Sequence, residues 1–250
     1  MLEGALTPDW PAATAVGALM SSRLGGVSGA PWQSLNLGVA VGDAAESVAE
    51  NRRRFEAAMG VPSVYLRQVH GKRVARLRVA DAGRTLGEPA DAAITTEPGI
   101  ACTVQVADCL PVLFAAPQGR GVGAAHAGWR GLAGGVLEAT VAALCEAAAC
   151  APQDLCVWLG PCIGPRQFEV GADVVEAFDH APRFLPRARA DGSMRWLADL
   201  PGLARDRLRA AGVTQFSGGA WCTVEDASRF FSFRRDGVTG RMAAAVWLRG

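Results

Sequence analysis

The sequence has no excess of charge of one sign, and this excludes one kind of partner. Its 250 residues include 25 basic and 24 acidic side chains, a formal net charge of +1, with no long run of either sign. A groove that follows a nucleic-acid backbone needs clustered basic residues, so we expect no nucleic-acid partner. All the basic residues except Lys72 are arginine. The residue type of any single arginine is therefore uninformative.

Long hydrophobic runs are also missing. The longest apolar stretch, residues 100–116, is interrupted by Gln105, Asp108 and Pro111, whereas a membrane-spanning helix needs about 20 predominantly apolar residues. The first ten residues contain acidic side chains and a proline, but no apolar core of signal-peptide length. The sequence therefore predicts a cytoplasmic protein without a membrane partner.

A cysteine pattern typical of a disulfide framework is absent as well. The seven cysteines are an odd number and none forms a Cys-x-x-Cys pair, which favours a reducing compartment. Six of them lie mostly in apolar or helical stretches and are typical of small core residues. Cys109 differs, because it lies beside Asp108 in a break between two apolar runs.

The apolar content that is present predicts a globular protein with an ample core. Half of the residues are hydrophobic and a fifth are charged, and no repeat or linker interrupts the chain, so we expect one domain over residues 1–250. The patterns predict strands over residues 13–22, 63–70, 73–80, 92–96, 100–106, 111–116, 121–126, 155–160 and 241–248, and helices over residues 43–60, 132–150, 171–181 and 197–212. Strands in clusters with helices between the clusters indicate an α+β fold with mixed sheets.

Three details of this pattern are specific enough to test. The strands over residues 63–70 and 73–80 are expected to form a hairpin. The four apolar runs between residues 92 and 126 are expected to be consecutive strands of one buried sheet. Asp43 is expected to cap the first helix, with Glu46 three residues later.

The chain has only three histidines, and two of them occupy similar places. His70 ends a predicted strand and is followed by glycine, and His126 ends another and is followed by Ala-Gly. Side chains at strand ends can converge on a pocket at the rim of a sheet. His180 lies at a predicted helix end, where we expect a surface or capping residue.

His70, Cys109 and His126 make a donor set suited to zinc. Two imidazoles and a thiolate leave the fourth position of a catalytic zinc free, and the soft thiolate also admits copper. The three residues are far apart in the sequence and share no local motif. The alternative is therefore two satisfied polar residues at strand ends and a buried thiol.

The segment HAGWRGLAGG follows a predicted strand and opens a helix. Free N–H groups at a helix start attract an anion, and Arg130 can add a bidentate grip on phosphate or carboxylate. The alternative is a tight turn whose arginine faces solvent. Without Gly-Lys-Ser or Gly-Lys-Thr, the segment is not a nucleotide P-loop.

Three further glycine-rich loops carry polar and aromatic residues. Loops of this kind in a compact domain are often functional, so we hypothesise that they line the pocket; the alternative is that their residues form turns and surface charges. The residues concerned are Arg23, Ser28 and Asn36, then Cys162, Phe168 and Glu169, and finally Phe231, Phe233, Arg234, Arg235 and Arg241.

Five segments, in this order, closely resemble those of the YfiH-type laccase-domain family: RQVHG, ADCLPVL, HAGWRG, GPCIGPRQFEVG and FSFRRDGVTGR. Bacterial members are also called polyphenol oxidase, peptidoglycan editing factor or purine nucleoside phosphorylase. The resemblance runs from the SSRLGGVS loop to the last strand. It implies one layered α-β-β-α domain similar to cysteine hydrolases, with a zinc ion held by His70, Cys109 and His126.

The resemblance also implies an activity. Family substrates are adenosine, inosine and methylthioadenosine, which phosphate cleaves to the base and ribose 1-phosphate, and adenosine deamination accompanies this reaction. Asp108 or Glu169 is a candidate to shuttle the proton. On this hypothesis the catalytic residues are Cys109, His126 and Asp108, and the substrate-binding residues are Arg130, Arg23, Asn36 and Glu169.

Other functions stay open at this point. Three histidines are too few for a four-copper laccase, but one copper in the His-Cys-His set would allow phenol oxidation as a side reaction. A cysteine hydrolase would use Cys109 as nucleophile and His126 or His70 as base. A role in editing a cell-wall precursor is a third possibility. The chain is compatible with a monomer or a homodimer.

Overall fold

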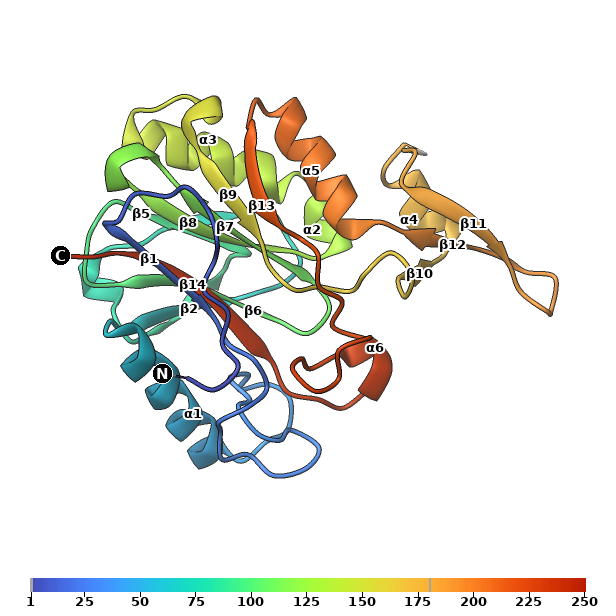
Figure 1. The fold of residues 1–250 in the computed structure, drawn as a ribbon, viewed down its shortest axis with the longest axis horizontal. Helices are drawn as coiled ribbons and strands as arrows, with labels where there is room; N and C mark the ends of the chain where they lie inside the picture. The colour runs from blue at the N-terminus through green and yellow to red at the C-terminus, as the bar shows by residue number, and fades with distance from the viewer. Residues whose placement is uncertain (1, 180) are drawn as a thin grey trace.

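The computed structural model describes residues 2–179 and 181–250, and its elements form four layers (Figure 1). Two sheets lie face to face. The helices α3 (Val136–Ala148) and α5 (Leu200–Ala210) cover one outer face, and α1 (Ala45–Met59) covers the other. The predicted α+β class with mixed sheets, in α-β-β-α layers, is confirmed. The prediction for His180 falls outside the described residues.

The sheet under α3 and α5 has six strands. Most neighbouring strands in it are antiparallel, but the pairs at its two edges are parallel. Side chains of the central strand alternate, so that Val112 and Phe114 pack toward the helices while Leu113 and Ala115 pack toward the second sheet. The strand order is β13 (Gln215–Gly218), β9 (Cys156–Leu159), β7 (Leu110–Ala115), β8 (Val122–Ala127), β5 (Ala92–Thr95) and β3 (Val74–Arg76).

The second sheet has five strands and carries α1 on its outer face. Ala243, Ala245 and Trp247 of its last strand pack against Phe55 and Met59 of that helix. The alternate residues of the same strand face the six-stranded sheet. The strand order is β1 (Val16–Met20), β14 (Met242–Leu248), β6 (Ala101–Val106), β2 (Ser63–Arg67) and β4 (Thr85–Pro89).

Apolar side chains from both sheets fill the space between them. Met20, Val104 and Val246 from one sheet meet Leu113 and Trp158 from the other, and all five are almost fully buried. Burying a side chain of this size stabilises the fold by about 1.5–3 kcal/mol relative to leaving it exposed. This core fixes the sheets against each other, and with them the loops that leave their edges.

A small third sheet extends beyond the main layers (Figure 1). The sequence did not predict it, because its long hairpin is largely exposed and its apolar residues alternate over only five positions in each strand. The sheet consists of β10 (Glu169–Val170), β12 (Met194–Ala198) and β11 (Phe184–Ala188), next to α4 (Ala172–Glu176). The remaining elements are the short helices α2 (Trp129–Ala133) and α6 (Phe233–Asp236) and the 3₁₀ turns Val79–Asp81, Pro117–Gly119 and Pro152–Asp154.

Two of the predicted strand pairings are wrong. β2 is not in a hairpin with β3, because β2 pairs with β6 and β4 while β3 pairs with β5 in the other sheet. The four runs between residues 92 and 126 do form strands, but β6 belongs to the five-stranded sheet. Apolar runs indicate that a strand is buried but not which strand lies beside it.

The predicted cap of α1 is also wrong. The N-cap residue is Ala44, without a side-chain hydrogen bond. The Asp43 carboxylate instead accepts hydrogen bonds from Ser28 Oγ at 2.6 Å and Asn36 Nδ2 at 2.8 Å. These polar partners lie 15 and 7 residues earlier in the chain, outside the span of a capping pattern, so that pattern could not reveal them.

One finding bears on membranes. Within residues 2–179 and 181–250, no helix combines the length and the apolar composition needed to cross a bilayer.

Candidate metal centre

Three side chains, two from connections and one from the end of a strand, meet at the edge shared by the two large sheets. His70 follows β2, Cys109 lies between β6 and β7, and His126 is the penultimate residue of β8. One donor atom from each lies within 4.8 Å of the others. His70 Nε2 is 3.8 Å from Cys109 Sγ, and the two imidazole centroids are 4.8 Å apart. The structure thus brings together the three residues that the sequence predicted as ligands.

The backbone at both connections has an uncommon conformation. His70 has φ 60°, and Asp108, directly before Cys109, has φ 89°. Residues other than glycine rarely adopt positive φ, and such conformations persist only where the surroundings hold them. Here the carbonyl oxygen of Asp108 accepts a hydrogen bond from Ile163 N at 2.9 Å.

The fully buried carboxylate of Asp91 holds the other connection. Its oxygens accept hydrogen bonds from the backbone N–H groups of Val69, His70 and Gly71 at 2.7–3.1 Å. The same carboxylate lies 2.9 Å from Nδ1 of His126. Asp91 therefore orients two of the three candidate ligands. Sequence reasoning missed it, and its position directly before a buried strand was the only signal.

Two glycines of the HAGWRG segment allow α2 to pack onto this cluster. A Cβ atom on Gly128 would lie 2.8 Å from Cδ2 of His70 and 2.9 Å from Sγ of Cys109. A Cβ atom on Gly131 would lie 2.8 Å from the carbonyl oxygen of Gly71. Real Cβ atoms essentially never come this close to other atoms, so both positions require glycine for close approach.

The cluster perturbs its own protonation. Burial favours the neutral thiol of Cys109, but the imidazoles of His126 and His70 outweigh it and lower the pKa of Cys109 to about 6. Burial also disfavours charge on His126, yet the Cys109 thiolate and the Asp91 carboxylate raise its pKa to about 9. For Asp91, burial is outweighed by hydrogen bonds from His126, Gly71 and Val69, which lower its pKa. Without a metal, the cluster favours a thiolate–imidazolium pair at neutral pH.

The donor set fits a metal ion. A thiolate and two imidazole nitrogens are the ligands of many zinc sites and also suit copper. Because Nδ1 of His126 faces Asp91, its Nε2 is left for the cluster. A carboxylate behind a histidine in this way is typical of metal sites. His70, Cys109 and His126 are therefore the candidate ligands of a metal centre.

A cavity of about 590 Å³ opens beside the cluster. Its size is that of a small-molecule site. Besides His70, Cys109 and His126 it is lined by Arg52, Arg67 and Arg241. No aspartate or glutamate lines it in the described part of the chain, so the charged residues around it favour an anionic ligand.

Asp108 lies next to the cluster, but its carboxylate points into a separate hydrogen-bond network. Oδ1 accepts from Thr223 Oγ1 and Oδ2 from the backbone N–H of Arg234, each at 2.6 Å. Both oxygens are thus engaged by groups of the C-terminal region. The carboxylate ties the Cys109 connection to that region.

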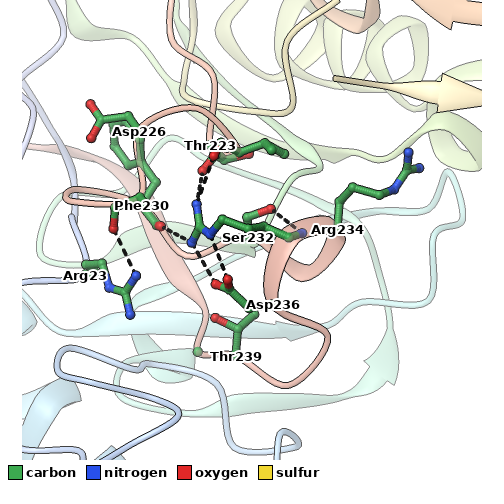
Figure 2. Close-up of polar contacts among 12 residues, drawn as sticks. Arg23, Thr223, Asp226, Phe230, Ser232, Arg234, Asp236 and Thr239 are labelled. Carbon is green, nitrogen blue, oxygen red and sulfur yellow. Dashed lines mark hydrogen bonds and ion pairs between the residues drawn. The ribbon is translucent and has the colours of Figure 1, made fainter. Parts of the chain in front are cut away.

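Figure 2 shows how the segment around Thr223, Ser232 and Asp236 is held. The guanidinium of Arg235 donates to the carbonyl oxygens of Thr223 at 2.8 Å and Phe230 at 3.0 Å, and to both carboxylate oxygens of Asp236 at 2.7 Å. Ser232 Oγ accepts from the backbone N–H of Arg235. These contacts fix α6, whose first residue, Phe233, lines the cavity.

The structure places three other predicted substrate-binding residues outside the lining of this cavity. Arg130 is exposed and stacks on Trp129, 4.3 Å from the ring centroid. Arg23 donates to the carbonyl oxygens of Gln33 and Ala227. Glu169 pairs with the arginines of the projecting hairpin.

Asn36, the fourth predicted substrate-binding residue, is buried and holds the backbone of two residues that line the cavity. Its Oδ1 accepts from the backbone N–H groups of Gly38 at 2.9 Å and Arg241 at 2.8 Å, and both of those residues line the cavity. The hypothesis that the C-terminal arginine-rich loop faces the pocket therefore holds for Arg241. It does not hold for Arg235, which does not line the cavity and whose guanidinium donates only to residues of the C-terminal segment 223–236.

The fold and the cluster together define an α-β-β-α protein with a possible metal centre in a cavity lined by arginines. The family described as multi-copper polyphenol oxidoreductase laccase matches residues 17–249, and the chain belongs to this YfiH-type laccase-domain family. It is 50% identical to a purine nucleoside phosphorylase of Pseudomonas aeruginosa over 98% of each chain. It is 47% identical to the purine nucleoside phosphorylase YfiH of Escherichia coli over 97% of this chain and 98% of that protein.

Solved structures agree with this assignment. A Neisseria meningitidis protein described as DUF152 has a TM-score of 0.91 and 45% identity, over 99% of this chain and 100% of that chain. YlmD from Geobacillus stearothermophilus has a TM-score of 0.87 and 34% identity, over 96% of each chain.

Proposed function

We propose that this chain is a zinc-dependent purine nucleoside phosphorylase whose residues 1–250 act as one catalytic domain. The observation that carries the proposal is that the His-Cys-His cluster lines the same cavity as three arginines. Phosphorolysis needs an anionic nucleophile beside the sugar, and the cavity combines a cation site with arginines for the anion. The names of the relatives in Pseudomonas aeruginosa and Escherichia coli support the same reaction.

The reaction breaks the glycosidic bond between the purine nitrogen and C1′ and forms a bond from a phosphate oxygen to C1′. The base leaves with a proton, and ribose 1-phosphate is the second product. A bound zinc ion would supply Lewis acidity toward an oxygen atom in the site. His70, Cys109 and His126 would hold the ion, and Asp91 keeps the ring of His126 oriented. We propose adenosine, inosine and methylthioadenosine as substrates, with adenosine deamination as an accompanying activity.

Several residue roles stay predictions. Asp108 as a proton shuttle would have to release Thr223 or the backbone of Arg234. Arg130 as an anion ligand would have to turn toward the cavity, which it does not line. Arg23 and Glu169 would act only if ligand binding rearranged their present contacts. For Asn36, a supporting role behind Arg241 suits its buried position.

Incubation of the purified protein with adenosine and phosphate tests the proposal directly. Adenine and ribose 1-phosphate are the expected products, with inosine as a second product of deamination. A phosphate-free incubation is the control, in which base release should stop while inosine formation continues. Absence of base release with adenosine, inosine and methylthioadenosine would reject the phosphorylase activity.

One observation favours a second candidate, a cysteine hydrolase. The lowered pKa of Cys109 and the raised pKa of His126 describe a thiolate–imidazolium pair, which is also the arrangement of a nucleophilic cysteine and its base. A chelator and a thiol alkylator separate the two. Loss of activity in chelator and recovery with zinc support the phosphorylase. Activity that survives the chelator but not alkylation of Cys109 supports the hydrolase, with Cys145→Ser as the control for alkylation elsewhere.

A further inference from the structure

Arg241 lines the cavity, with its guanidinium over the ring of Phe233 at 5.9 Å; one end of the guanidinium is anchored by hydrogen bonds, and its other edge has no hydrogen-bond partner among the described residues. Nη1 donates to the carbonyl oxygens of Thr239 and Gly240, each at 3.1 Å. Among residues 2–179 and 181–250, no partner is within hydrogen-bonding distance of Nε or Nη2. Nε and Nη2 form the edge through which a guanidinium can bind an oxyanion with two parallel hydrogen bonds.

The same chain shows what this edge does elsewhere. Nε and Nη2 of Arg53 bind both oxygens of Glu50 at 2.7 and 2.9 Å. The same two atoms of Arg166 bind Glu225 at 3.0 and 2.7 Å. For Arg241, no carboxylate oxygen lies within 4.0 Å of the guanidinium anywhere in the described part of the chain.

The charge of Arg241 is also partly removed from water. Burial lowers the pKa of Arg241, and the nearby Cys109 and Asp108 only partly oppose this. A guanidinium that loses hydration without an anion in hydrogen-bonding contact is costly to the fold. Its persistence beside the cluster indicates a position prepared for an anion that arrives with the ligand.

The surrounding loops fix this position. The backbone N–H of Arg241 donates to Oδ1 of the buried Asn36. A Cβ atom on Gly38 would lie 2.7 Å from Cγ of Arg241, so only glycine at this position leaves room for the side chain of Arg241. Anchoring on two carbonyl oxygens, one amide and one glycine makes Arg241 a preorganised group.

The two other cavity arginines are used differently. Arg52 stacks on Tyr65 at 3.6 Å, and its Nε already donates to the carbonyl oxygen of Leu37. Arg67 is exposed at the end of its strand. Arg241 is therefore the cavity arginine that combines burial with an unpaired bidentate edge.

We propose that Arg241 holds a phosphate-type oxyanion through Nε and Nη2, beside the His-Cys-His cluster. The inference deepens the proposed function and rests on it for the identity of the anion, which is the attacking inorganic phosphate. A phosphoryl group carried by a nucleotide has the same chemistry and is distinguished by the test.

The test measures binding of inorganic phosphate by titration calorimetry on the protein as purified, without nucleoside. We expect Arg241→Gln to weaken phosphate binding about ten-fold or more, because a bidentate charge-assisted contact is lost. Arg241→Lys should recover only part of it, since the charge remains but the fork is gone. Arg120→Gln is the matched control: Arg120 is exposed and also donates to backbone carbonyl oxygens, so its loss removes the same charge without touching the cavity.

Each result decides the proposal. Unchanged phosphate affinity in Arg241→Gln overturns it, as does a larger loss in Arg130→Gln than in Arg241→Gln. If wild type binds a nucleoside 5′-monophosphate but not inorganic phosphate, and Arg241→Gln loses that binding, the oxyanion site stands with the nucleotide as its source. Should the glutamine variant fail to fold by circular dichroism, the lysine variant takes its place, with at least a several-fold loss expected and no loss overturning the proposal.

The proposed function can fail separately. Phosphate binding that depends on Arg241 in a protein that releases no base keeps the oxyanion site and rejects the phosphorylase. Base release with an unchanged KM for phosphate in Arg241→Gln keeps the phosphorylase and rejects the site.

Discussion

Nδ1 of His126 lies 2.9 Å from Oδ1 of Asp91. The Asp91 carboxylate also accepts hydrogen bonds from three backbone N–H groups of the loop that carries His70. One buried carboxylate thus orients the ring of one candidate ligand and the backbone of another. Cys109 is placed independently, by the connection between β6 and β7. The cluster therefore depends on Asp91 for two of its three donors.

Asp91→Asn should weaken metal binding. Asparagine replaces one carboxylate oxygen with an NH₂ group, so either the amides of Val69 and Gly71 or the amide of His70 and the ring of His126 lose their acceptor. Changing such an outer partner typically lowers metal affinity about 10–100-fold. Competition with a chromophoric chelator measures the change, and the exposed Asp9→Asn is the control. Equal affinity of the Asp91 variant and wild type would show that the carboxylate does not position the ligands.

Gly128→Ala should damage the same site from the other side. The added methyl group would press on His70 and Cys109 at less than 3.0 Å, and overpacking of this kind costs about 1–3 kcal/mol. We expect reduced metal affinity with the fold retained, measured by metal content after dialysis. Gly87→Ala is the control, because a Cβ atom there meets nothing within 4 Å. Full metal content in Gly128→Ala would contradict the close packing of residue 128 against His70 and Cys109.

Thr223→Val should lower stability. The buried Thr223 hydroxyl donates to the Asp108 carboxylate at 2.6 Å, and a hydrogen bond to a charged group is worth about 1.5–3 kcal/mol. Urea unfolding of wild type and variant measures the difference. Thr214→Val, at an exposed threonine with a 3.4 Å contact, should change stability far less. Similar losses in both variants would mean that the Asp108 network does not tie Cys109 to the C-terminal region.

The only tyrosine, Tyr65, should titrate late. Burial against α1 raises its pKa to about 12, although Arg52 opposes this, from an ordinary value of 10.0. Since the unfolded chain loses this proton first, the free energy of unfolding falls as pH rises from about 10 to 12, by roughly 2–3 kcal/mol in all. Tyrosinate absorbance follows the titration without interference from other tyrosines. A midpoint near pH 10 in the folded protein would contradict the burial of this strand.

The candidate ligands could be predicted from sequence because histidine is rare in this chain and each ligand lies in a distinctive segment. Asp91 could not, since its role depends on a strand from a different part of the chain lying beside His126. The glycines around Arg130 suggested an anion seat, whereas Gly128 and Gly131 allow α2 to pack against the cluster.

The layers of the fold could likewise be predicted, but the pairing of strands could not. Residues 92–126 indicate four buried strands by their apolar runs, and the sequence gives no sign that β6 leaves its neighbours for the other sheet. The hairpin of β11 and β12 has apolar residues on one face, among them Phe184 and Trp196, but the alternation spans only five residues in each strand and most of the hairpin is exposed. Hydrophobic pattern reports burial, while pairing is set by contacts distant in sequence.

X-ray absorption spectroscopy of protein purified without added metal tests the central claim most directly. The account predicts one zinc ion per chain, with one sulfur ligand at about 2.3 Å and imidazole nitrogens at about 2.0–2.1 Å. The sulfur signal should vanish in Cys109→Ala and persist in Cys145→Ala. An active protein that contains no metal, or an ion without a sulfur neighbour, would contradict a shared site for His70, Cys109 and His126.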